Sequence, residues 1–368
     1  MFDRRLIQHF DWWLLGLTLL LATVGLTILY SAVTAGASDV QRTLVAKQAI
    51  SCCIGLGAMI MVFIFNYKEL DRWGGVIYLA AVVLLIAVML HGRNISGARR
   101  WLSIGPVMLQ PSEPMKIAVI VILAKFYSKR ANINGFTLRE LILPMILVMF
   151  PFLLIVKQPD LGTGMLVLLI AASMTVYVKI ERRSLICIIV SCLVMVPMLW
   201  SFFLKEYQQE RIKTFLNPER DPLGSGYHII QSKIAIGSGK LVGKGFLKGT
   251  QNALSFLPEH HTDFIISVLS EEWGFIGTGF VLVVFLLLIV WGLRIAYGCR
   301  DPFGTILSVG VTAMFFWQVF INVGMVMGLM PVVGVPLPLI SYGGSSVVTS
   351  LIGIGLLMNV SMRRFIIE

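Results

Sequence analysis

The sequence predicts an all-α, polytopic membrane protein of about ten transmembrane helices with one large external loop. The first observation is composition: 57% of the 368 residues are hydrophobic and 13% are charged, whereas a typical soluble domain has about 25% charged residues. The second is a series of apolar runs, each near the length of about 20 residues that a helix needs to cross a bilayer. The third is one long polar stretch, residues 205–262, which follows the first seven runs.

The apolar runs define the expected helices in chain order. They lie near residues 12–34, 47–65, 75–91, 113–127, 141–156, 160–178, 184–204, 264–293, 304–329 and 341–361. The first run follows Arg4 and Arg5 and ends without a convincing cleavage site, so we expect it to remain as a helix. We therefore expect residues 1–368 to form a single integral-membrane domain. The five cysteines lie within or beside these runs without metal-binding spacing, which indicates packing roles.

The distribution of Lys and Arg predicts the orientation of the helices. Loops on the side of the N-terminus carry fifteen of these residues, and the short loops on the other side carry six: Arg42, Lys47, Arg93, Arg99, Arg100 and Lys157. Positive residues concentrate in cytoplasmic loops. We therefore predict a multi-pass protein of the cytoplasmic membrane with both termini in the cytoplasm and residues 205–262 outside. The net charge of +11 then reflects topology, and we expect no nucleic-acid binding.

The polar stretch at residues 205–262 connects the seventh and eighth expected helices. Its backbone polar groups would be unsatisfied in lipid, so it must lie on one membrane face. Within it, residues 227–236 interleave isoleucines with polar residues, which predicts a short amphipathic helix on the membrane surface. The run 237–245 departs from the Walker pattern at Ser238 and Gly245, and we reject nucleotide binding there.

A first candidate site lies on the outer side, before and within the start of the fourth expected helix. Its candidate residues are Arg99, Arg100 and Trp101 in GARRWL (97–102) and Gln110, Glu113 and Lys116 in QPSEPMK (110–116). Ser112 is predicted to cap the helix. One interpretation is a structural Glu113–Lys116 ion pair with Trp101 at the membrane interface. The other is an anion site, in which the helix N-terminus, the two arginines and the lysine bind a phosphate or diphosphate.

Two further acids lie on the same predicted membrane face. Asp160 is predicted mainly to cap the sixth helix. Asp263 has two interpretations, a cap of the eighth helix or a general base. Helical spacing places Asp263, Ser267, Ser270 and Glu271 on one face, and this polar stripe exceeds what a cap requires. His260 and His261 beside Asp263 do not predict a metal site, because adjacent histidines rarely converge on one ion.

The C-terminal part of the chain carries the most specific motif. It reads NVGMVMGLMPVVGVPLPLISYGGSS (322–346) and includes Ser341 and Tyr342. With GARRWL, QPSEPMK, KQPDLGT (157–163) and HTDF (261–264) in this order, the chain resembles the SEDS family (shape, elongation, division and sporulation) over nearly its whole length. Pro114 is the one departure noticed, and proline is tolerated in a first helical turn. The segments 217–239 and 249–251 are more similar to RodA, the elongation member, than to FtsW, the division member.

The resemblance implies a peptidoglycan glycosyltransferase of ten helices. Such proteins polymerise lipid II, a disaccharide-pentapeptide on a polyprenyl diphosphate, at the outer face of the cytoplasmic membrane. It places the family's essential acid at Asp263, its functional tryptophan at Trp101, and the polar cluster of the fourth helix at Glu113 and Lys116. With Asp263 as the base and no enzyme nucleophile, the reaction would invert the anomeric centre. The residues expected to support the site are Asp160, Ser267, Glu271, Ser341 and Tyr342.

The expected partners are lipid II, membrane lipid and a class B penicillin-binding protein, since the sequence contains no transpeptidase domain. A divalent cation that accompanies the diphosphate is the one cofactor we consider. Two other functions stay open from the residues: a lipid II flippase or other transporter, because polar residues within spans suit a translocation path, and a non-enzymatic scaffold of a wall-synthesis complex. Against a transporter, the candidate residues cluster on one membrane face instead of near the midplane.

Overall fold

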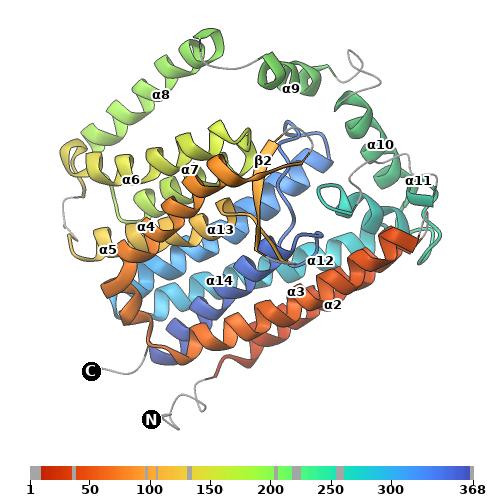
Figure 1. Ribbon diagram of the computed structural model, residues 1–368, viewed down its shortest axis with the longest axis horizontal. Coiled ribbons are helices and arrows are strands. Elements are labelled where there is room, and N and C mark those ends of the chain that lie inside the picture. Colours follow the sequence, from red (N-terminus) through yellow and green to blue (C-terminus); the bar gives the residue numbers. More distant parts are fainter. Residues whose placement is uncertain are drawn as a thin grey trace.

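The computed structural model describes residues 10–34, 39–95, 98–104, 107–130, 135–202, 206–217, 225–253 and 261–364. Helices make up most of the molecule (Figure 1). The helices are α2 (Trp12–Thr34), α3 (Asp39–Ile64), α4 (Tyr67–His91), α5 (Ser112–Ser128), α6 (Leu138–Lys157), α7 (Leu161–Tyr177), α8 (Arg182–Phe202), α9 (Glu206–Leu216), α10 (Ser225–Ser238), α11 (Thr250–Ala253), α12 (Ile265–Gly298), α13 (Pro302–Val326) and α14 (Gly344–Arg363). The predicted all-α class is confirmed.

Each expected span coincides with one of the longer helices, α2 to α8 and α12 to α14. Within the described residues, seven helices are long and apolar enough to cross a membrane: Trp12–Thr34, Thr43–Ile64, Tyr67–His91, Leu138–Lys157, Ile265–Gly298, Pro302–Val326 and Gly344–Arg363. Helices α5 and α7 have 17 residues each, short of the usual spanning length of about 20. The polytopic membrane fold is therefore confirmed, and the count of ten stays a prediction.

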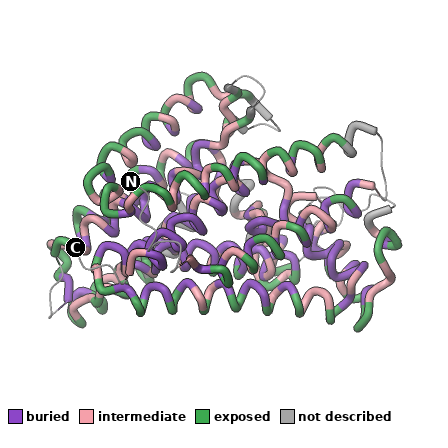
Figure 2. The backbone as a smooth tube through the Cα atoms, turned by 90° about the horizontal axis from the view of Figure 1, so that it is seen from below, coloured by how far each residue is buried: buried purple, intermediate pink, exposed green. Residues whose placement is uncertain are grey.

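The last two helices form the centre of the bundle. The apolar window of α14 is 89% buried and that of α13 is 72% buried, whereas no other candidate span exceeds 44%. Helix α14 packs along α3, and α13 packs against α12, α7 and α5. Figure 2 shows buried residues on the inner helices and exposed residues along the outer ones. The outer helices therefore present their apolar side chains to lipid, as a membrane bundle requires.

A small sheet lies between α4 and α5 and was not predicted. Strands β1 (Arg93–Ile95), β2 (Ala98–Ile104) and β3 (Val107–Leu109) pair antiparallel in this order. The register pairs Arg93 with Trp101 and Ile104 with Val107. Residues 98–102 of the GARRWL motif lie in the middle strand of this sheet, which gives them a fixed geometry.

The segment that was expected to lie outside the membrane contains helices α9, α10 and α11. Helix α10 confirms the short helix expected at 227–236, but its buried face packs against α12 and α13. Ile229 is buried there, whereas Ile234 is exposed. Ser232 Oγ lies 2.8 Å from Ser267 Oγ and donates to the carbonyl of Val326 at 2.7 Å. The helix thus covers the start of α12, and its contact with a membrane surface stays a prediction.

Helix α12 is broken at Gly274, whose φ of 67° and ψ of −164° leave the helical region. Backbone groups of residues 240–245 replace the hydrogen bonds that the break removes. The amides of Phe275 and Ile276 donate to Lys240 (2.9 Å) and Leu241 (3.1 Å), and the carbonyls of Glu271 and Glu272 accept from Lys244 (3.0 Å) and Gly245 (2.9 Å). Glycine suits the break because it alone adopts positive φ without steric cost.

Candidate functional site

The turn that carries Asp263, residues 261–264, is held by its main chain. Three successive carbonyls accept hydrogen bonds: His261 from the Tyr342 amide (2.9 Å), Thr262 from Ser341 Oγ (2.6 Å) and Asp263 from Asn322 Nδ2 (3.0 Å). Asn322 also donates to the carbonyl of Val335 at 2.7 Å. The donors all come from the 322–346 motif, so this motif positions the acid.

The segment between α13 and α14 is shaped to make these bonds. Gly328, Gly334 and Leu339 have positive φ angles of 66°, 72° and 63°, which turn the chain sharply. Ser341 Oγ accepts from the Leu337 amide at 2.8 Å. Gln48 of α3 donates to the Ser341 carbonyl (3.0 Å) and accepts from the Gly343 amide (3.1 Å). Sequence reasoning missed Gln48, although a buried polar residue inside an apolar run was a usable signal.

The Asp263 side chain is partly buried and lies over Gly334. A Cβ atom built on Gly334 would be 3.4 Å from Asp263 Oδ2. The neighbouring carbonyl of Val333 lies against Gly162 of α7, where a Cβ atom would be 2.3 Å from it. Val333 and Gly334 therefore lie between Asp263 and the first turn of α7.

Gly334 provides a direct test of this close approach. We expect Gly334→Ala to cost about 1–2 kcal/mol of stability, because an L-residue is strained at positive φ. We also expect it to lower activity further, since the new methyl group would contact the Asp263 carboxylate. Gly328→Ala is the matched control: its φ of 66° imposes similar strain, but its Cβ atom would meet the end of the Lys233 side chain and Ile229 Cγ2, with no Asp263 atom among its nearest neighbours. Equal activities of the two variants, normalised to folded protein, would contradict the interpretation.

A second cluster surrounds Asp160 at the start of α7. Asp160 caps this helix through the Thr163 amide at 3.4 Å, which confirms the predicted cap. Its carboxylate also accepts from Gln110 Nε2 (3.2 Å) and Ser112 Oγ (3.3 Å). The predicted cap at Ser112 is wrong: Pro111 is the N-cap of α5, and the Ser112 hydroxyl is bound to Asp160 instead. Asp160 thus joins α5 to α7 and is 3% exposed.

The two candidate arginines, Arg99 and Arg100, are neighbours in strand β2, and their side chains point to opposite faces. Arg100 donates from Nε to the Gln158 carbonyl at 3.1 Å and also donates to the Pro159 carbonyl, and its Nη1 lies 3.9 Å from Asp160 Oδ1. Arg99 is exposed and Trp101 is partly buried. Because neighbouring residues of a strand point to opposite faces, Arg99 and Trp101 share the face away from the Asp160 cluster. The structure therefore joins Arg100, Gln110 and Asp160 and places Arg99 and Trp101 apart from them.

Glu113 and Lys116 form the predicted ion pair in the first turns of α5. Lys116 Nζ lies 3.0 Å from Oε1 and 2.9 Å from Oε2 of Glu113. Lys116 is 0% exposed and Glu113 is 2% exposed. The pair is fully enclosed, so its formation must offset the cost of removing two charges from water.

The 322–346 motif also connects the Asp263 turn with the Asp160 cluster. Ser345, in the first turn of α14, accepts from the Gln110 amide at 3.0 Å and donates to the Met108 carbonyl at 3.2 Å. Tyr342, three residues earlier, holds the Asp263 turn, and its ring lies 5.9 Å from that of His261. Burial raises the pKa of the Tyr342 hydroxyl above its ordinary value. The sequence 341–345 thus contacts both the Asp263 turn and the Gln110 strand end.

Two members of the predicted polar stripe on α12, Ser267 and Glu271, are covered by residues of α10 and of the 244–251 segment. Ser267 is bound to Ser232 of α10, as described above. Glu271, 0% exposed, accepts from Lys244 Nζ (2.6 Å), the Thr250 amide (2.8 Å), Thr250 Oγ1 (3.0 Å) and the Gln251 amide (3.1 Å). Its carboxylate therefore organises residues 244–251. Ser267 and Glu271 are therefore both buried under these covering residues.

A metal site was not expected, and among the described residues we find no group of three His, Cys, Asp or Glu side chains arranged to hold an ion. His260 lies outside the described residues.

The cap interpretation of Asp263 is not supported, since the N-cap position of α12 is occupied by Phe264.

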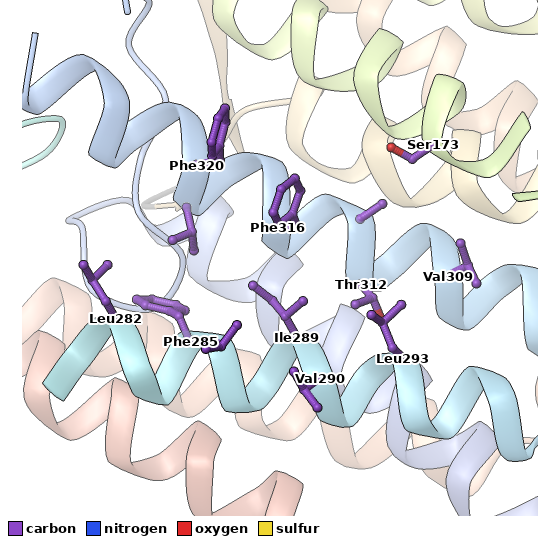
Figure 3. A pocket seen from close by; sticks show the side chains of 13 residues that line it. Ser173, Leu282, Phe285, Ile289, Val290, Leu293, Val309, Thr312, Phe316 and Phe320 are labelled. Atoms are coloured by element: carbon purple, nitrogen blue, oxygen red, sulfur yellow. The ribbon is translucent and has the colours of Figure 1, made fainter. Parts of the chain in front are cut away.

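An apolar groove of about 510 Å³ runs between α12 and α13 (Figure 3). Leu282, Phe285 and Ile289 of α12 line one side, and Phe316 and Phe320 of α13 line the other. Phe320, at one end of the groove, precedes Asn322 by two residues in α13, so it lies at a similar height along the helix but on a different side of it. The size of the groove lies in the range of small-molecule sites, about 300–1,000 Å³.

The fold and the site define a polytopic membrane protein with an acid held at one end of its helical bundle. The family model for cell cycle proteins of the FtsW/RodA/SpoVE type matches residues 11–365. The chain belongs to this family, which confirms the resemblance to the SEDS proteins.

Individual relatives agree with this assignment. The chain is 40% identical to the peptidoglycan glycosyltransferase MrdB of Escherichia coli strain K12 over 347 residues, 94% of this chain and 93% of MrdB. It is similar to a chain in the solved structure of a peptidoglycan synthase complex that coordinates polymerization and crosslinking, with a TM-score of 0.82, 33% identity, and coverage of 97% and 98%. The rod shape determining protein RodA of Thermus thermophilus gives a TM-score of 0.71 with 27% identity and the same coverage.

Proposed function

We propose that this protein is a peptidoglycan glycosyltransferase that polymerises lipid II into glycan strands at the outer face of the cytoplasmic membrane during cell elongation and shape maintenance. The observation that carries the proposal is the Asp263 turn, fixed by three successive carbonyl hydrogen bonds with the carboxylate over Gly334. A general base must be held within reach of the proton it takes. The activity in the name of the E. coli relative supports the same reaction.

Asp263 is the general base of the proposed reaction. A sugar hydroxyl of the acceptor attacks the anomeric carbon of the donor and transfers its proton to the Asp263 carboxylate. The bond between that carbon and the diphosphate oxygen breaks, and the polyprenyl diphosphate leaves with the electron pair. A single displacement inverts the anomeric centre, so an α-linked donor gives a β-linked glycan.

The proposed substrate-binding residues are Arg99, Arg100, Trp101, Gln110, Glu113 and Lys116. Exposed Arg99 and its neighbour on the same strand face, Trp101, are free to meet a large substrate. Arg100 and Lys116 face the carboxylates of Asp160 and Glu113, and we assign them to the positive potential that stabilises the leaving diphosphate. A divalent cation bound to the diphosphate would add to this stabilisation.

The apolar groove between α12 and α13 supports a lipid-linked substrate. Its lining is almost entirely hydrocarbon, and Phe320 at one end of it lies two residues before Asn322 in α13. An isoprenoid tail in the groove would place the attached diphosphate toward that end of the groove. The cross-linking partner that we propose is a class B penicillin-binding protein, as the similarity to a synthase complex suggests.

The proposed function is tested by incubating the purified protein with lipid II, alone and with its penicillin-binding partner. We expect long glycan chains, resolved by gel electrophoresis, that are degraded by a muramidase. The flippase interpretation predicts the opposite: transfer of lipid II across vesicle membranes without any glycan. The scaffold interpretation predicts neither activity.

The proposed orientation gives a separate prediction. A reporter fused after Glu368 should be cytoplasmic, and a tag inserted near Gly249 should be reachable from outside the cell. Both follow from the excess of Lys and Arg in the loops on the side of the termini. An externally accessible C-terminus would place Asp263 on the cytoplasmic side and contradict the reaction proposed above.

A further inference from the structure

The loop at residues 240–248 is rigidly attached to α12. Its backbone completes the helix across the break at Gly274, and Lys244 pairs with Glu271, as described above. Four of its residues have left-handed φ angles: Lys240 (50°), Gly243 (82°), Gly245 (102°) and Leu247 (63°). The following residues are tied down as well, through Thr250 and Gln251. The loop therefore moves as one body with the outer part of α12.

The length of α12 places this loop at a membrane boundary. Near one end of the helix, the Arg294 guanidinium lies over the Trp291 ring at 4.8 Å, a pair of residue types typical of the membrane interface. Gly274 lies about 20 residues away, which at about 1.5 Å per residue corresponds to the thickness of about 30 Å of a hydrocarbon core. The break, and the loop bonded to it, thus lie at the opposite boundary.

The side chains of the loop continue the lipid-facing surface of α12. Immediately after the break, Phe275 and Ile276 are 71% and 63% exposed. On the loop, Leu241 and Val242 are 65% and 75% exposed, and the adjacent aromatic residue Phe246 is 43% exposed and stacks on Tyr30. The Leu241 carbonyl is bonded to the Ile276 amide, so the two apolar surfaces adjoin.

Positive side chains flank this apolar surface. Lys240 and Lys248 are exposed on either side of the loop tip. Apolar side chains next to lysines are typical of protein segments that enter the headgroup region, where the ammonium groups meet lipid phosphates. A protein partner would not require the surface to continue the lipid-facing side of a transmembrane helix.

We propose that the 240–248 loop inserts into the outer leaflet of the phospholipid bilayer, with Leu241, Val242 and Phe246 among the upper acyl chains and Lys240 and Lys248 at the phosphates. Because the loop is bonded to residues 271–276, its insertion fixes the height of the outer part of α12 above the bilayer. The Asp263 turn, which begins this part of the helix, is held at that height with it.

Depth-resolved quenching tests the proposal. In a cysteine-free variant, Val242→Cys and, as a reference within the bilayer, Val283→Cys of α12 are labelled with an environment-sensitive fluorophore. The proteins are placed in phospholipid nanodiscs that carry nitroxide quenchers at the headgroup, high on the acyl chain or deep in it. We expect the label at residue 242 to be quenched most by the shallow nitroxides, the label at 283 most by the deep one, and both to be shielded from aqueous iodide.

Two results would overturn the proposal. One is quenching of the residue 242 label by iodide together with insensitivity to every lipid nitroxide, which would place the loop in water. The other is shielding that arises only after the transpeptidase partner is added, which would assign the surface to a protein contact. Both labelled positions are exposed, so folding is checked by the elution profile of each variant and does not limit the comparison.

Discussion

Asp263→Asn is expected to leave a folded, membrane-inserted protein with little or no glycan-forming activity. Asparagine has nearly the same size as aspartate, and the bonds that hold this turn involve main-chain carbonyls. Stability should therefore change by no more than about 1 kcal/mol, the net value of a typical single hydrogen bond. Asparagine cannot accept the proton, so a general-base contribution of roughly 100- to 10,000-fold should be lost. Initial rates of lipid II polymerisation measure the effect.

Asp301→Asn is the matched control at the other end of α12. Asp301 caps α13 by accepting from the Gly304 amide at 2.9 Å, and asparagine can make the same bond. This variant should polymerise lipid II at the wild-type rate. If Asp263→Asn were equally active, the base would lie elsewhere. Glu271, the next acid on the helix, is a poor replacement because its carboxylate is already occupied by residues 244–251.

Lys116→Met is expected to be the most destabilising of the proposed changes. It would leave the Glu113 carboxylate enclosed without its partner, and such a loss typically costs about 3–5 kcal/mol. Adding Glu113→Gln removes the second charge and should restore most of the stability. Thermal unfolding in detergent, followed by fluorescence, measures both steps.

The activity of the double variant then separates the two interpretations of the pair. We expect polymerisation to stay low in this restored protein, because Lys116 is proposed to contribute positive potential to the diphosphate site. Recovery of polymerisation together with stability would show that the pair is structural only, and the anion site would lose Lys116. Glu113 and Lys116 are in contact, so the effects of the two single changes on the free energy of unfolding are not expected to add up to the effect of the double change.

The helices were predictable because the bilayer imposes their length and apolar character on the sequence. Each expected span coincided with a helix, and Asp160 capped α7 as its position before an apolar run suggested. The sheet at β1 to β3 was missed because two of its strands have three residues each, too few for an alternating pattern to emerge. The GARRWL motif was singled out for its charged residues, and nothing in it indicated a β-strand.

The contacts of the site depended on tertiary structure that no local pattern contains. Helical spacing placed Glu271 on one face with Asp263, but it gave no sign that Lys244 and the amides of residues 250 and 251 bind the Glu271 carboxylate. Likewise, Gln48 lies 293 residues from Ser341 in sequence and binds its carbonyl. Spacing within one helix predicts which residues share a face, and it cannot predict which distant segment covers that face.

The hydrogen bonds to the main-chain carbonyls of residues 261–263 have a practical consequence for enzymology. Since these three bonds end on carbonyl oxygens, an exchange of the side chain at position 263 leaves all three of them in place. Glutamate, histidine or a chemically modified cysteine could be installed there as bases of graded strength. The dependence of rate on basicity across such a series would report how far the proton has moved when the glycosidic bond forms.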